Sequence, residues 1–540
     1  MKYIKLLLIA GAVFATASCN KDPLDLGPID YYGSENFWTS ESQVDGYMDG
    51  LHSNMRDVAW THTITFGELR GGHYKPGVSS DGSTVSDGDI CEQNFDADHT
   101  GVSTFGGYYG KITNVNLFIA RVEKMDDKIL PTAKKNYYLG IAHGLRAFYY
   151  FDLYRIYGTV PLRLDVAVID GEINPINLYM KRSSGSKVMA QIKSDLWASL
   201  KYFGDVKDFN PYGHGAKAYW SKAATEYLAG EVYLWNAKVK VDDQVAVTTD
   251  IDSAKVFFEN VTKNYGLSLQ NNFADVFSTT NKGNSEIIFA IRYVENEATN
   301  SNGNFTYISD GRGVAPTQLN DKGETFGDPL NLKGAGMQRY QYIDNIFLAY
   351  DLEDARRNAT FVASYDRDIF QATGELVLQG TYVGKNNGHV NSANVRVFDG
   401  DYVYYRLSGA YLALAEIANF KGTSGEVKKN IDIVRKRAYG SNWGDGSMYG
   451  YTEGSFTTNE LAILAEKDKE FVQEGQRWWD LNRMTLTKGG KHLVFCEEGN
   501  ANKNGKPVLK ESEAYKVFWP LDKTILGNDP ELEQTPGYSK

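Results

Sequence analysis

Apolar residues recur every three or four positions in several stretches of the chain, which is the spacing of an α-helix with one buried face. The clearest stretch covers residues 134–158, where Tyr138, Leu145 and Leu153 fall on one face and Gly158 ends the pattern. The same spacing predicts further helices over residues 216–237, 251–265, 404–420, 425–439 and 457–484.

These predicted helices fall into pairs. The second and third form an antiparallel pair of the kind found in tetratricopeptide repeats, and the fourth and fifth form another such pair. The last helix is long, and it opens with Thr457 and Glu460 at the spacing of a capping box. Helix pairs of this kind pack on one another, so they predict a scaffold.

Long segments rich in Gly, Asn, Ser and Asp separate the helices, mainly over residues 71–110, 297–336 and 485–508. Loops of this length in a compact domain usually carry function. Strand-like runs occupy residues 285–294 and 374–383. The pattern therefore predicts a helical scaffold with large loop insertions and a few short strands.

The composition limits the possible functions. The chain has 540 residues, of which 42% are hydrophobic and 23% charged, and this is ordinary for a globular protein. A net charge of −11, from 57 basic and 68 acidic residues, does not favour binding to nucleic acid. The 36 Tyr, 26 Phe and 9 Trp make 13% of the chain, and such rings suit interfaces and sugar sites as well as packing between helices.

The first residues predict export and a lipid anchor. Lys2 and Lys5 precede a short apolar run over residues 6–14, and small residues then lead to Cys19. The run is too short to span a bilayer, which takes about 20 residues. A cysteine at this place is typical of a lipobox, although Thr16 stands where Leu is usual. The alternative is an ordinary signal peptide followed by a coincidental cysteine. Cys91 and Cys496 then remain, and we interpret them as separate thiols rather than a disulfide.

Signatures of catalysis and of metal binding are weak or absent. The sequence has no GxSxG, HExxH, P-loop or complete GxGxxG motif, and its eight histidines form no HxH or HxxxH pair. An EF-hand-like match is formed by Asn500, Asn502, Asn504, Gly505 and Glu511. It supplies a single carboxylate, so we interpret it as an Asn/Gly turn and expect no metal and no other cofactor. Catalytic carboxylates are defined by their separation in space, so the sequence leaves a glycosidase open.

Four groups of segments resemble the SusD/RagB family, outer-membrane nutrient-binding lipoproteins of the Bacteroidetes. They lie, in family order, at residues 145–162 (LRAFYYFDLYRIYGTVPL), 406–419 with 430–437, 466–483 (EKDKEFVQEGQRWWDLNR), and 518–521 with 528–530 and 534–538. Lys467, Leu521 and Thr535 depart from the residues that the family prefers. In the third group, charged residues three or four positions apart predict a charge ladder along one helix, which we interpret as packing. They are Glu470, Glu474, Arg477, Asp480 and Arg483.

The resemblance implies a binding protein without catalysis. It implies a mainly α, SusD-like fold, in which tetratricopeptide-like helix pairs form a scaffold beside a large, irregular, loop-rich lobe with a few short strands. It implies a location on the outer membrane, facing the cell exterior through the lipid anchor. It also implies a SusC-like TonB-dependent transporter as partner, with an oligosaccharide as the usual ligand. We divide the chain into a lipoprotein signal peptide (1–18), a lipidated tether (19–35) and a single SusD-like domain (36–540). In that domain the helical scaffold covers about 110–265 and 400–484, and the loop-rich ligand lobe about 60–110 and 270–400.

Two loop regions offer aromatic rings beside polar groups, as sugar sites do. The first contains Trp60, Tyr74, Asp81, Tyr108 and Tyr109, in a loop where the family commonly has ligand contacts. The second contains Asn304, Tyr307, Arg312, Arg339 and Tyr340. The alternative is that these rings fill small cores under the loops. The sequence therefore predicts a non-catalytic, cell-surface glycan-binding lipoprotein that delivers nutrient to the transporter. Peptide capture and a secreted glycoside hydrolase are the alternatives.

Overall fold

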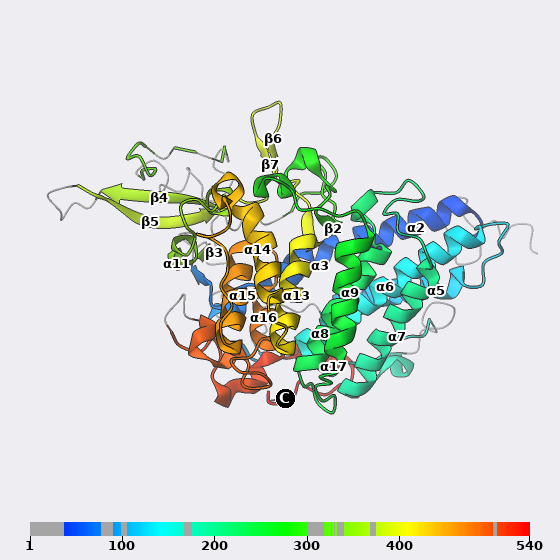
Figure 1. The fold of residues 1–540 in the computed structure, drawn as a ribbon. Helices are drawn as coiled ribbons and strands as arrows, with labels where there is room; N and C mark the ends of the chain where they lie inside the picture. The colour runs from blue at the N-terminus through cyan, green and yellow to red at the C-terminus, as the bar shows by residue number, and fades with distance from the viewer. Residues whose placement is uncertain are drawn as a thin grey trace, which may run out of the picture.

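The computed structural model describes residues 37–76, 90–98, 105–166, 175–300, 318–325, 327–328, 330–331, 340–367, 374–500 and 505–539. The predicted signal peptide, the tether and Cys19 lie outside these residues. Long helices pack side by side through the centre and right of Figure 1, and the β4–β5 hairpin projects at the upper left. The helical, loop-rich fold predicted from the sequence is confirmed.

The first half of the helical scaffold is built around α6 (Thr132–Tyr157). Nearly every α6 side chain from Tyr137 onward is buried, because α5, α7 and α8 pack around it. Glycines allow this close packing: a Cβ at Gly144 would lie 2.1 Å from Nε1 of Trp220. The other long helices of this half are α2 (Glu41–Ser53), α5 (Phe105–Val122), α7 (Gly185–Phe203), α8 (Lys222–Lys238) and α9 (Asp250–Asn264).

The second half contains α13 (Leu407–Lys421), α14 (Glu426–Tyr439), α15 (Phe456–Glu470) and α16 (Arg477–Arg483). α8 packs against α9, α13 against α14, and α9 against α13, so the two predicted helix pairs stack on each other. The predicted start of the fourth helix at residue 404 is wrong. Residues 402–406 form a strand, whose backbone is held by pairing with β2.

The predicted long helix over residues 457–484 is also wrong, because the helix breaks between α15 and α16. Gln473 and Gly475 have φ of 63° and 75°, which an α-helix does not allow. The break lets the chain cross residue 67 at contact distance: a Cβ at Gly67 would lie 2.2 Å from the carbonyl oxygen of Gly475. The N-cap of α15 is Ser455, whose hydroxyl accepts the Thr458 N–H, instead of Thr457.

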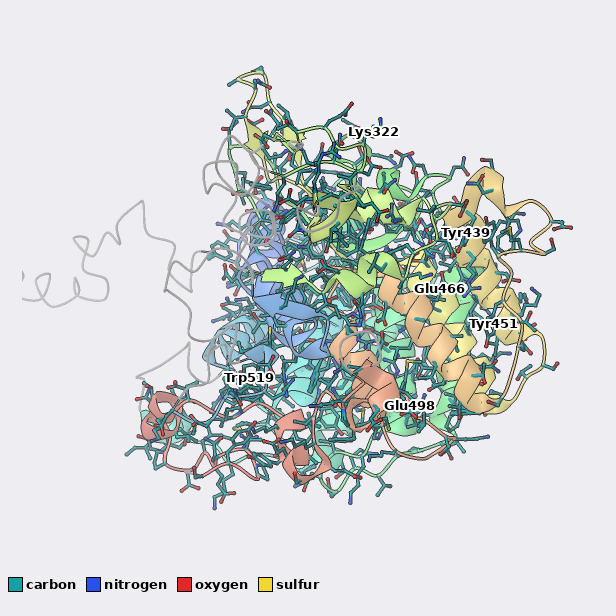
Figure 2. The ribbon with its side chains drawn as sticks, turned by 90° about the vertical axis from the view of Figure 1, so that its left-hand side faces the viewer. Lys322, Tyr439, Tyr451, Glu466, Glu498 and Trp519 are labelled. Carbon is teal, nitrogen blue, oxygen red and sulfur yellow. The ribbon has the colours of Figure 1, made fainter. Side chains whose placement is uncertain are left out.

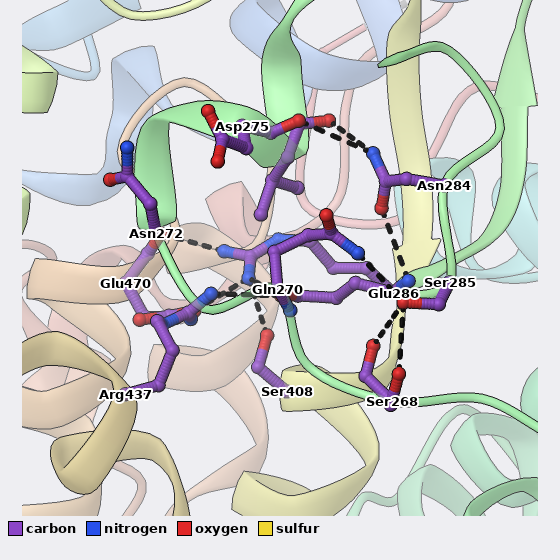
Figure 3. A network of polar contacts seen from close by, with 12 residues as sticks. Ser268, Gln270, Asn272, Asp275, Asn284, Ser285, Glu286, Ser408, Arg437 and Glu470 are labelled. Atoms are coloured by element: carbon purple, nitrogen blue, oxygen red, sulfur yellow. Dashed lines mark hydrogen bonds and ion pairs between the residues drawn. The ribbon is translucent and has the colours of Figure 1, made fainter. Parts of the chain in front are cut away.

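The predicted charge ladder is kept only between Asp480 and Arg483, which pair at 2.6 Å within α16. Glu470 instead forms buried ion pairs with other elements (Figure 3). Glu470 accepts bonds from Arg406 at 2.5 Å and from Arg437, and its second oxygen lies 2.9 Å from Arg356. Arg406 and Arg437 also share Glu286, each at 2.9 Å. All five side chains are at least nine-tenths buried. The network joins α14, the end of α15, Arg356 at the start of α12 (Arg356–Thr360), Arg406 at the end of β8 (Tyr402–Arg406) and Glu286, which directly precedes β2 (Ile287–Ile291).

The strands form four two-stranded antiparallel sheets among the described residues. They pair β1 (Tyr74–Pro76) with β3 (Tyr340–Tyr342), β2 (Ile287–Ile291) with β8 (Tyr402–Arg406), β4 (Phe361–Arg367) with β5 (Leu376–Val383), and β6 (His389–Val390) with β7 (Arg396–Val397). The two predicted strands are confirmed as β2 and β5.

Short helical segments complete the fold. The α-helical ones are α3 (Arg56–Trp60), α11 (Asp344–Leu348), α12 (Arg356–Thr360) and α17 (Lys523–Asn528). A π-helical turn, η1, covers Thr61–Phe66. The 3₁₀ turns are η2 (Leu69–Gly71), η3 (Pro175–Leu178), η4 (Ala216–Ala218), η5 (Phe273–Phe277), η6 (Thr279–Asn281), η9 (Gly440–Trp443), η10 (Leu493–Phe495), η11 (Glu497–Asn500) and η12 (Glu511–Val517).

The C-terminal segment returns to the first half of the scaffold through Trp519. Its N–H donates to the Ile156 carbonyl of α6 at 2.7 Å, and its ring stacks on Phe95. The Thr535 hydroxyl donates to the Trp519 carbonyl at 2.8 Å. Thr535, which departs from the residue that the family prefers, therefore stabilises the C-terminal segment. In Figure 2, Trp519 lies at the lower left, on the other side of the view from Tyr439. Cys91 and Cys496 are not joined by a disulfide, as expected.

Candidate functional site

The β1–β3 ladder joins the two predicted ligand regions. Tyr74 pairs with Tyr342 and Pro76 with Tyr340. Along the chain, the first loop region continues after Pro76, the last residue of β1, and the second ends before Tyr340, the first residue of β3. Because Pro76 pairs with Tyr340, these two points are neighbours in the ladder. The Tyr74 and Tyr342 rings lie 4.2 Å apart, and Lys75 Nζ lies 2.8 Å from an Asp344 carboxylate oxygen. The ladder is therefore held by ring packing and by an ion pair.

The inner side of β3 is fixed by the segment that separates α15 from α16. The Tyr342 hydroxyl accepts the Gln473 N–H at 2.9 Å and lies 3.1 Å from Glu68 Oε2. The other Glu68 oxygen accepts the Gly475 N–H at 2.9 Å. Burial raises the pKa of Glu68 to about 8, because these hydrogen bonds offset only part of the cost of a buried charge. The carboxyl group is therefore largely protonated at neutral pH.

A second buried carboxylate lies close by, on α15. Both oxygens of Asp468 accept bonds from Arg477 at 2.7 Å, and His73 Nε2 lies 3.7 Å from one of them. Burial raises the pKa of Asp468 to about 6, although the Arg477 charge opposes the shift. His73 directly precedes β1. Its contact with Asp468 therefore connects the 466–483 motif to the strand that leads into the first loop region. The motif is therefore structural, as interpreted from the sequence, and its Asp468 and Gly475 contact His73 and Glu68 near β1.

The β4–β5 hairpin holds part of the second loop region in place. Leu319 and Tyr365 exchange two backbone hydrogen bonds, at 2.7 and 2.8 Å, and the Tyr382 hydroxyl donates to Gln318 at 3.0 Å. Gln341 of β3 approaches the hairpin where Gly380 has no side chain, since a Cβ there would lie 2.6 Å from the Gln341 amide nitrogen. No local sequence signal identifies these supporting residues, because their partners are distant in sequence.

Three of the ten predicted ligand residues have described side chains. Tyr74 and Tyr108 are 1% and 0% exposed, so neither ring has an open face for stacking on a ligand. The Tyr108 hydroxyl donates to Asp152 at 3.2 Å, and the half-buried Tyr109 donates to the Pro161 carbonyl at 2.6 Å. Both bonds tie α5 to the 145–162 motif. The burial of Tyr74 and Tyr108 favours the packing interpretation for these two rings, whereas the half-buried Tyr109 stays a candidate contact.

The remaining seven predicted residues are only partly placed. Trp60 ends α3 and Tyr340 begins β3, so the structure gives their backbone positions and not their side chains. The others lie outside the described residues, and they are Asp81, Asn304, Tyr307, Arg312 and Arg339.

Comparison with known proteins identifies the fold family. A sequence model of the SusD family matches residues 363–538, and a model described as starch-binding associating with outer membrane matches residues 31–234. A SusD superfamily protein of Bacteroides fragilis, known from its crystal structure, is 55% identical, with a TM-score of 0.87 over 93% of this chain and 100% of that one. The chain belongs to the SusD family.

Other SusD-like structures agree with this assignment. NanU of B. fragilis is 30% identical, with a TM-score of 0.79 over 95% of this chain and 100% of that one. Surface glycan-binding protein A of Bacteroides uniformis has a TM-score of 0.68 over 92% of this chain and 99% of that one, but at 18% identity it supports the fold alone. The structural neighbours of this SusD-family chain thus include a protein named for glycan binding.

The described residues contain no group of three or more His, Cys, Asp or Glu side chains placed to hold a metal ion. In the EF-hand-like segment, the Asn500 amide donates to the Lys506 carbonyl at 2.8 Å, and Glu511 pairs with Lys491 at 2.9 Å. Asn502 and Asn504 lie outside the description. Within the part of the chain that is described, no helix is both long enough and apolar enough to cross a membrane.

Glu68→Gln will make stability less dependent on pH. The raised pKa means that the folded state binds its proton more tightly than the unfolded state, so wild-type stability falls as pH rises from about 4.5 towards 8. Each unit of pKa shift corresponds to about 1.4 kcal/mol, so we expect the variant to be more stable than wild type by at least about 1 kcal/mol at pH 8.5. Urea unfolding between pH 5 and 8.5 measures this difference.

The control for this experiment is Glu375→Gln, which changes an exposed carboxylate at the start of β5 and should leave the pH profile unchanged. Parallel pH profiles for wild type and Glu68→Gln would show that Glu68 is ionised in the folded protein.

Proposed function

We propose that this SusD-family protein is a non-catalytic, cell-surface glycan-binding lipoprotein that captures an oligosaccharide and delivers it to a SusC-like TonB-dependent transporter. Family membership carries the proposal: the chain is 55% identical to a SusD superfamily protein, and the model matching residues 31–234 is described as starch-binding and associating with the outer membrane. The fold supplies a rigid helical frame on which two loop regions meet, an arrangement that suits capture of a flexible ligand.

The glycan contacts come from the two loop regions joined by β1 and β3. Tyr74 and Tyr108 serve the frame, and the remaining proposed contacts are Trp60, Asp81, Tyr109, Asn304, Tyr307, Arg312, Arg339 and Tyr340. A sugar places its apolar C–H face on an aromatic ring, while Asp, Asn and Arg side chains hydrogen-bond its hydroxyl groups. The chemistry at this site is recognition, so the bound glycan leaves unchanged.

The partner and the location follow the same reasoning. A lid over a transporter needs a stable contact face, which buries more than about 1,000 Å² in total. The lipid on Cys19 and the polar tether over residues 19–35 would hold the protein at the outer membrane and let the domain reach the barrel. Two observations support this proposal. The first residues resemble a lipoprotein signal peptide, and the family model that matches residues 31–234 is described as associating with the outer membrane.

A glycan array followed by calorimetry tests binding, with a parallel assay for new reducing ends. We expect weak binding, with a Kd of about 10⁻⁴–10⁻³ M, and no cleavage. One stacked ring contributes about 1 kcal/mol, so Trp60→Ala and Tyr307→Ala should each weaken binding about fivefold. The control is Trp197→Ala, which removes a ring that is 55% exposed on α7.

Three outcomes would redirect the proposal. Cleavage that survives rigorous purification would make the protein a glycoside hydrolase. Binding to a peptide library without binding to the array would make it a peptide-capturing member of the family. Unchanged affinity in both folded loop variants, with circular dichroism matching wild type, would place the glycan elsewhere on the molecule.

A further inference from the structure

One buried carboxyl group, that of Glu68, lies where three segments distant in sequence meet at the end of β3. Glu68 directly precedes η2, Tyr342 ends β3, and Gly475 lies between α15 and α16. The Glu68 and Tyr342 side chains are 2% and 1% exposed. One carboxyl oxygen of Glu68 accepts the Gly475 N–H at 2.9 Å, and the other lies 3.1 Å from the Tyr342 hydroxyl. A single side chain therefore connects all three segments.

The hydrogen bonds around Glu68 lie next to the pairing of β1 with β3. The Tyr342 hydroxyl also accepts the Gln473 N–H at 2.9 Å, which ties the end of β3 to the segment after α15. The next residue, Ile343, donates its N–H to the carbonyl of His73, the residue before β1, at 2.9 Å. A change at Glu68 is therefore transmitted through Tyr342 to the end of the ladder.

Close backbone packing keeps water away from the carboxyl group. A Cβ added at Gly67 would lie 2.2 Å from the Gly475 carbonyl oxygen, and one added at Gly475 would lie 2.7 Å from Cα of Thr63. The Trp478 N–H also donates to the Gly67 carbonyl at 2.8 Å. Because these segments touch through their backbones, water reaches Glu68 only when they separate.

The charged groups around Glu68 are paired with other residues. Lys385, two residues after β5, forms an ion pair with Glu474. Asp468 of α15 accepts bonds from Arg477 with both oxygens, at 2.7 Å. Among the described residues, Glu68 has hydrogen bonds but no ion pair of its own. Burial therefore dominates and raises the pKa of Glu68 to about 8. The hydrogen bonds and the charge of Lys385 oppose this shift, and the charge of Asp468 adds to it.

We propose that Glu68 is a proton-dependent anchor, which holds β3 to the 473–475 segment while protonated and releases it when ionised. A protonated carboxyl group both donates and accepts hydrogen bonds, so it satisfies its neighbours without a buried charge. An ionised group would be buried without a paired cation, which is costly, and separation of the segments relieves this cost by admitting water. Rising pH therefore favours an open end of the ladder.

The direction of the effect follows from the two pKa values of Glu68. The closed ladder holds the proton with a pKa of about 8, whereas a carboxyl group in water has its ordinary value of 4.5. The population of the open ladder therefore rises as pH increases from about 4.5 towards 8, by at most about tenfold per pH unit, and is constant above that range.

The consequence for glycan capture rests on the proposed function. The ladder joins the two loop regions that would contact the glycan, and a looser ladder leaves more of the site to be ordered on binding. For the glycan selected on the array, we therefore expect the affinity of wild type to fall between pH 6.5 and 8, and that of Glu68→Gln to change less.

Hydrogen exchange of the mature protein, followed by mass spectrometry, tests the anchor without a glycan. Between pH 6.5 and 8, after correction for the chemical exchange rate, protection of the peptides covering residues 340–343 and 473–478 should fall at least about fivefold in wild type. In Glu68→Gln it should fall less than about twofold, because glutamine does not ionise. Glu426→Gln, which changes a 41% exposed carboxylate on α14, is the matched control and should follow wild type.

This pH window separates Glu68 from its titratable neighbours. Burial raises the pKa of Asp468 to about 6 and lowers the pKa of Lys385 to about 8. Asp468 is therefore mostly ionised throughout the window, and Lys385 is mostly charged over most of it.

Infrared spectroscopy measures the protonation of Glu68 independently. At pH 7 the band of protonated carboxylic acids should be weaker in Glu68→Gln than in wild type, and unchanged in Glu426→Gln. In wild type this component should disappear around pH 8, and the protection of the ladder peptides should stop falling there. If Glu68→Gln does not fold, the agreement of these two wild-type transitions decides.

Three results would overturn the proposal: constant protection of the ladder peptides in wild type, the same pH dependence in Glu68→Gln, or no acid band from Glu68 at pH 7. Neither measurement uses a glycan. Failure of the anchor would therefore leave the proposed capture standing, and an array without a binder would leave the anchor standing.

Discussion

Replacing Glu470 by alanine will destabilise the protein by about 3–5 kcal/mol, the range found when one partner of a buried ion pair is removed. Glu470 is 0% exposed and contacts three arginines, Arg356, Arg406 and Arg437. Without its carboxylate, three guanidinium groups stay buried with fewer counter-charges. Urea unfolding at pH 7 measures the loss, and a fall in the midpoint at constant slope would confirm it.

The matched control is Glu426→Ala on α14. Glu426 pairs with Lys429 at 3.0 Å, but the two side chains are 41% and 62% exposed, so the pair contributes about 0–1 kcal/mol. Similar losses in the two variants would contradict the role given to burial.

The effect of Glu470 should also depend on pH. Burial alone would raise the pKa of Glu470, but the charges of Arg437, Arg406 and Arg356 outweigh it and hold the pKa well below its usual range. A lowered carboxyl pKa stabilises the fold above the pKa of the unfolded chain, about 4.5, and this contribution is lost as pH falls towards the folded value. The difference between wild type and Glu470→Ala should therefore be full at pH 7 and shrink below about pH 4.5.

The same network explains where sequence reasoning succeeded and where it failed for the fold. Helical spacing found α9 and α14, because each buries one face whose residues are neighbours along the helix. It also found α6, α8 and α13, although these helices are buried on nearly all sides. The spacing did not reveal that α15 ends at Glu470. Charged residues three or four positions apart form the same sequence pattern whether they pair within one helix or with arginines from distant segments. The spacing also missed β8, since all five of its residues are buried and show no alternation.

For the candidate site, the structure shows what holds the two predicted regions together, which the sequence did not show. The long polar segments on either side of β1 and β3 were found from composition, and the ladder that joins them could not be, because it pairs Tyr74 with Tyr342 across more than 260 positions. An aromatic residue carries no local mark of burial, so Tyr108 in α5 could not be distinguished from a ring exposed to a ligand.

Replacing Cys19 by alanine will release the protein from the membrane almost completely. In the proposed topology the lipid on Cys19 is the attachment to the bilayer, and no helix in the described part of the chain could span it instead. Each buried methylene of an acyl chain contributes about 0.8 kcal/mol, so an anchor with two or more chains holds a protein stably, whereas a single chain gives only reversible binding. Transporter contacts alone should retain a minor, detergent-sensitive fraction.

Membrane fractionation of cells expressing wild type or Cys19→Ala, with labelled fatty acid, measures both attachment and modification. The label should be incorporated in wild type and absent from the variant. Cys91→Ala is the matched control, because it removes a cysteine of the folded domain and should leave attachment and labelling unchanged. If Cys19→Ala stays membrane-bound to the wild-type extent, then contacts of the folded domain hold the protein there, and the tether is not its anchor. If the variant is released but wild type carries no label, the segment before Cys19 acts as an ordinary signal peptide and the cysteine contributes to attachment in some other way.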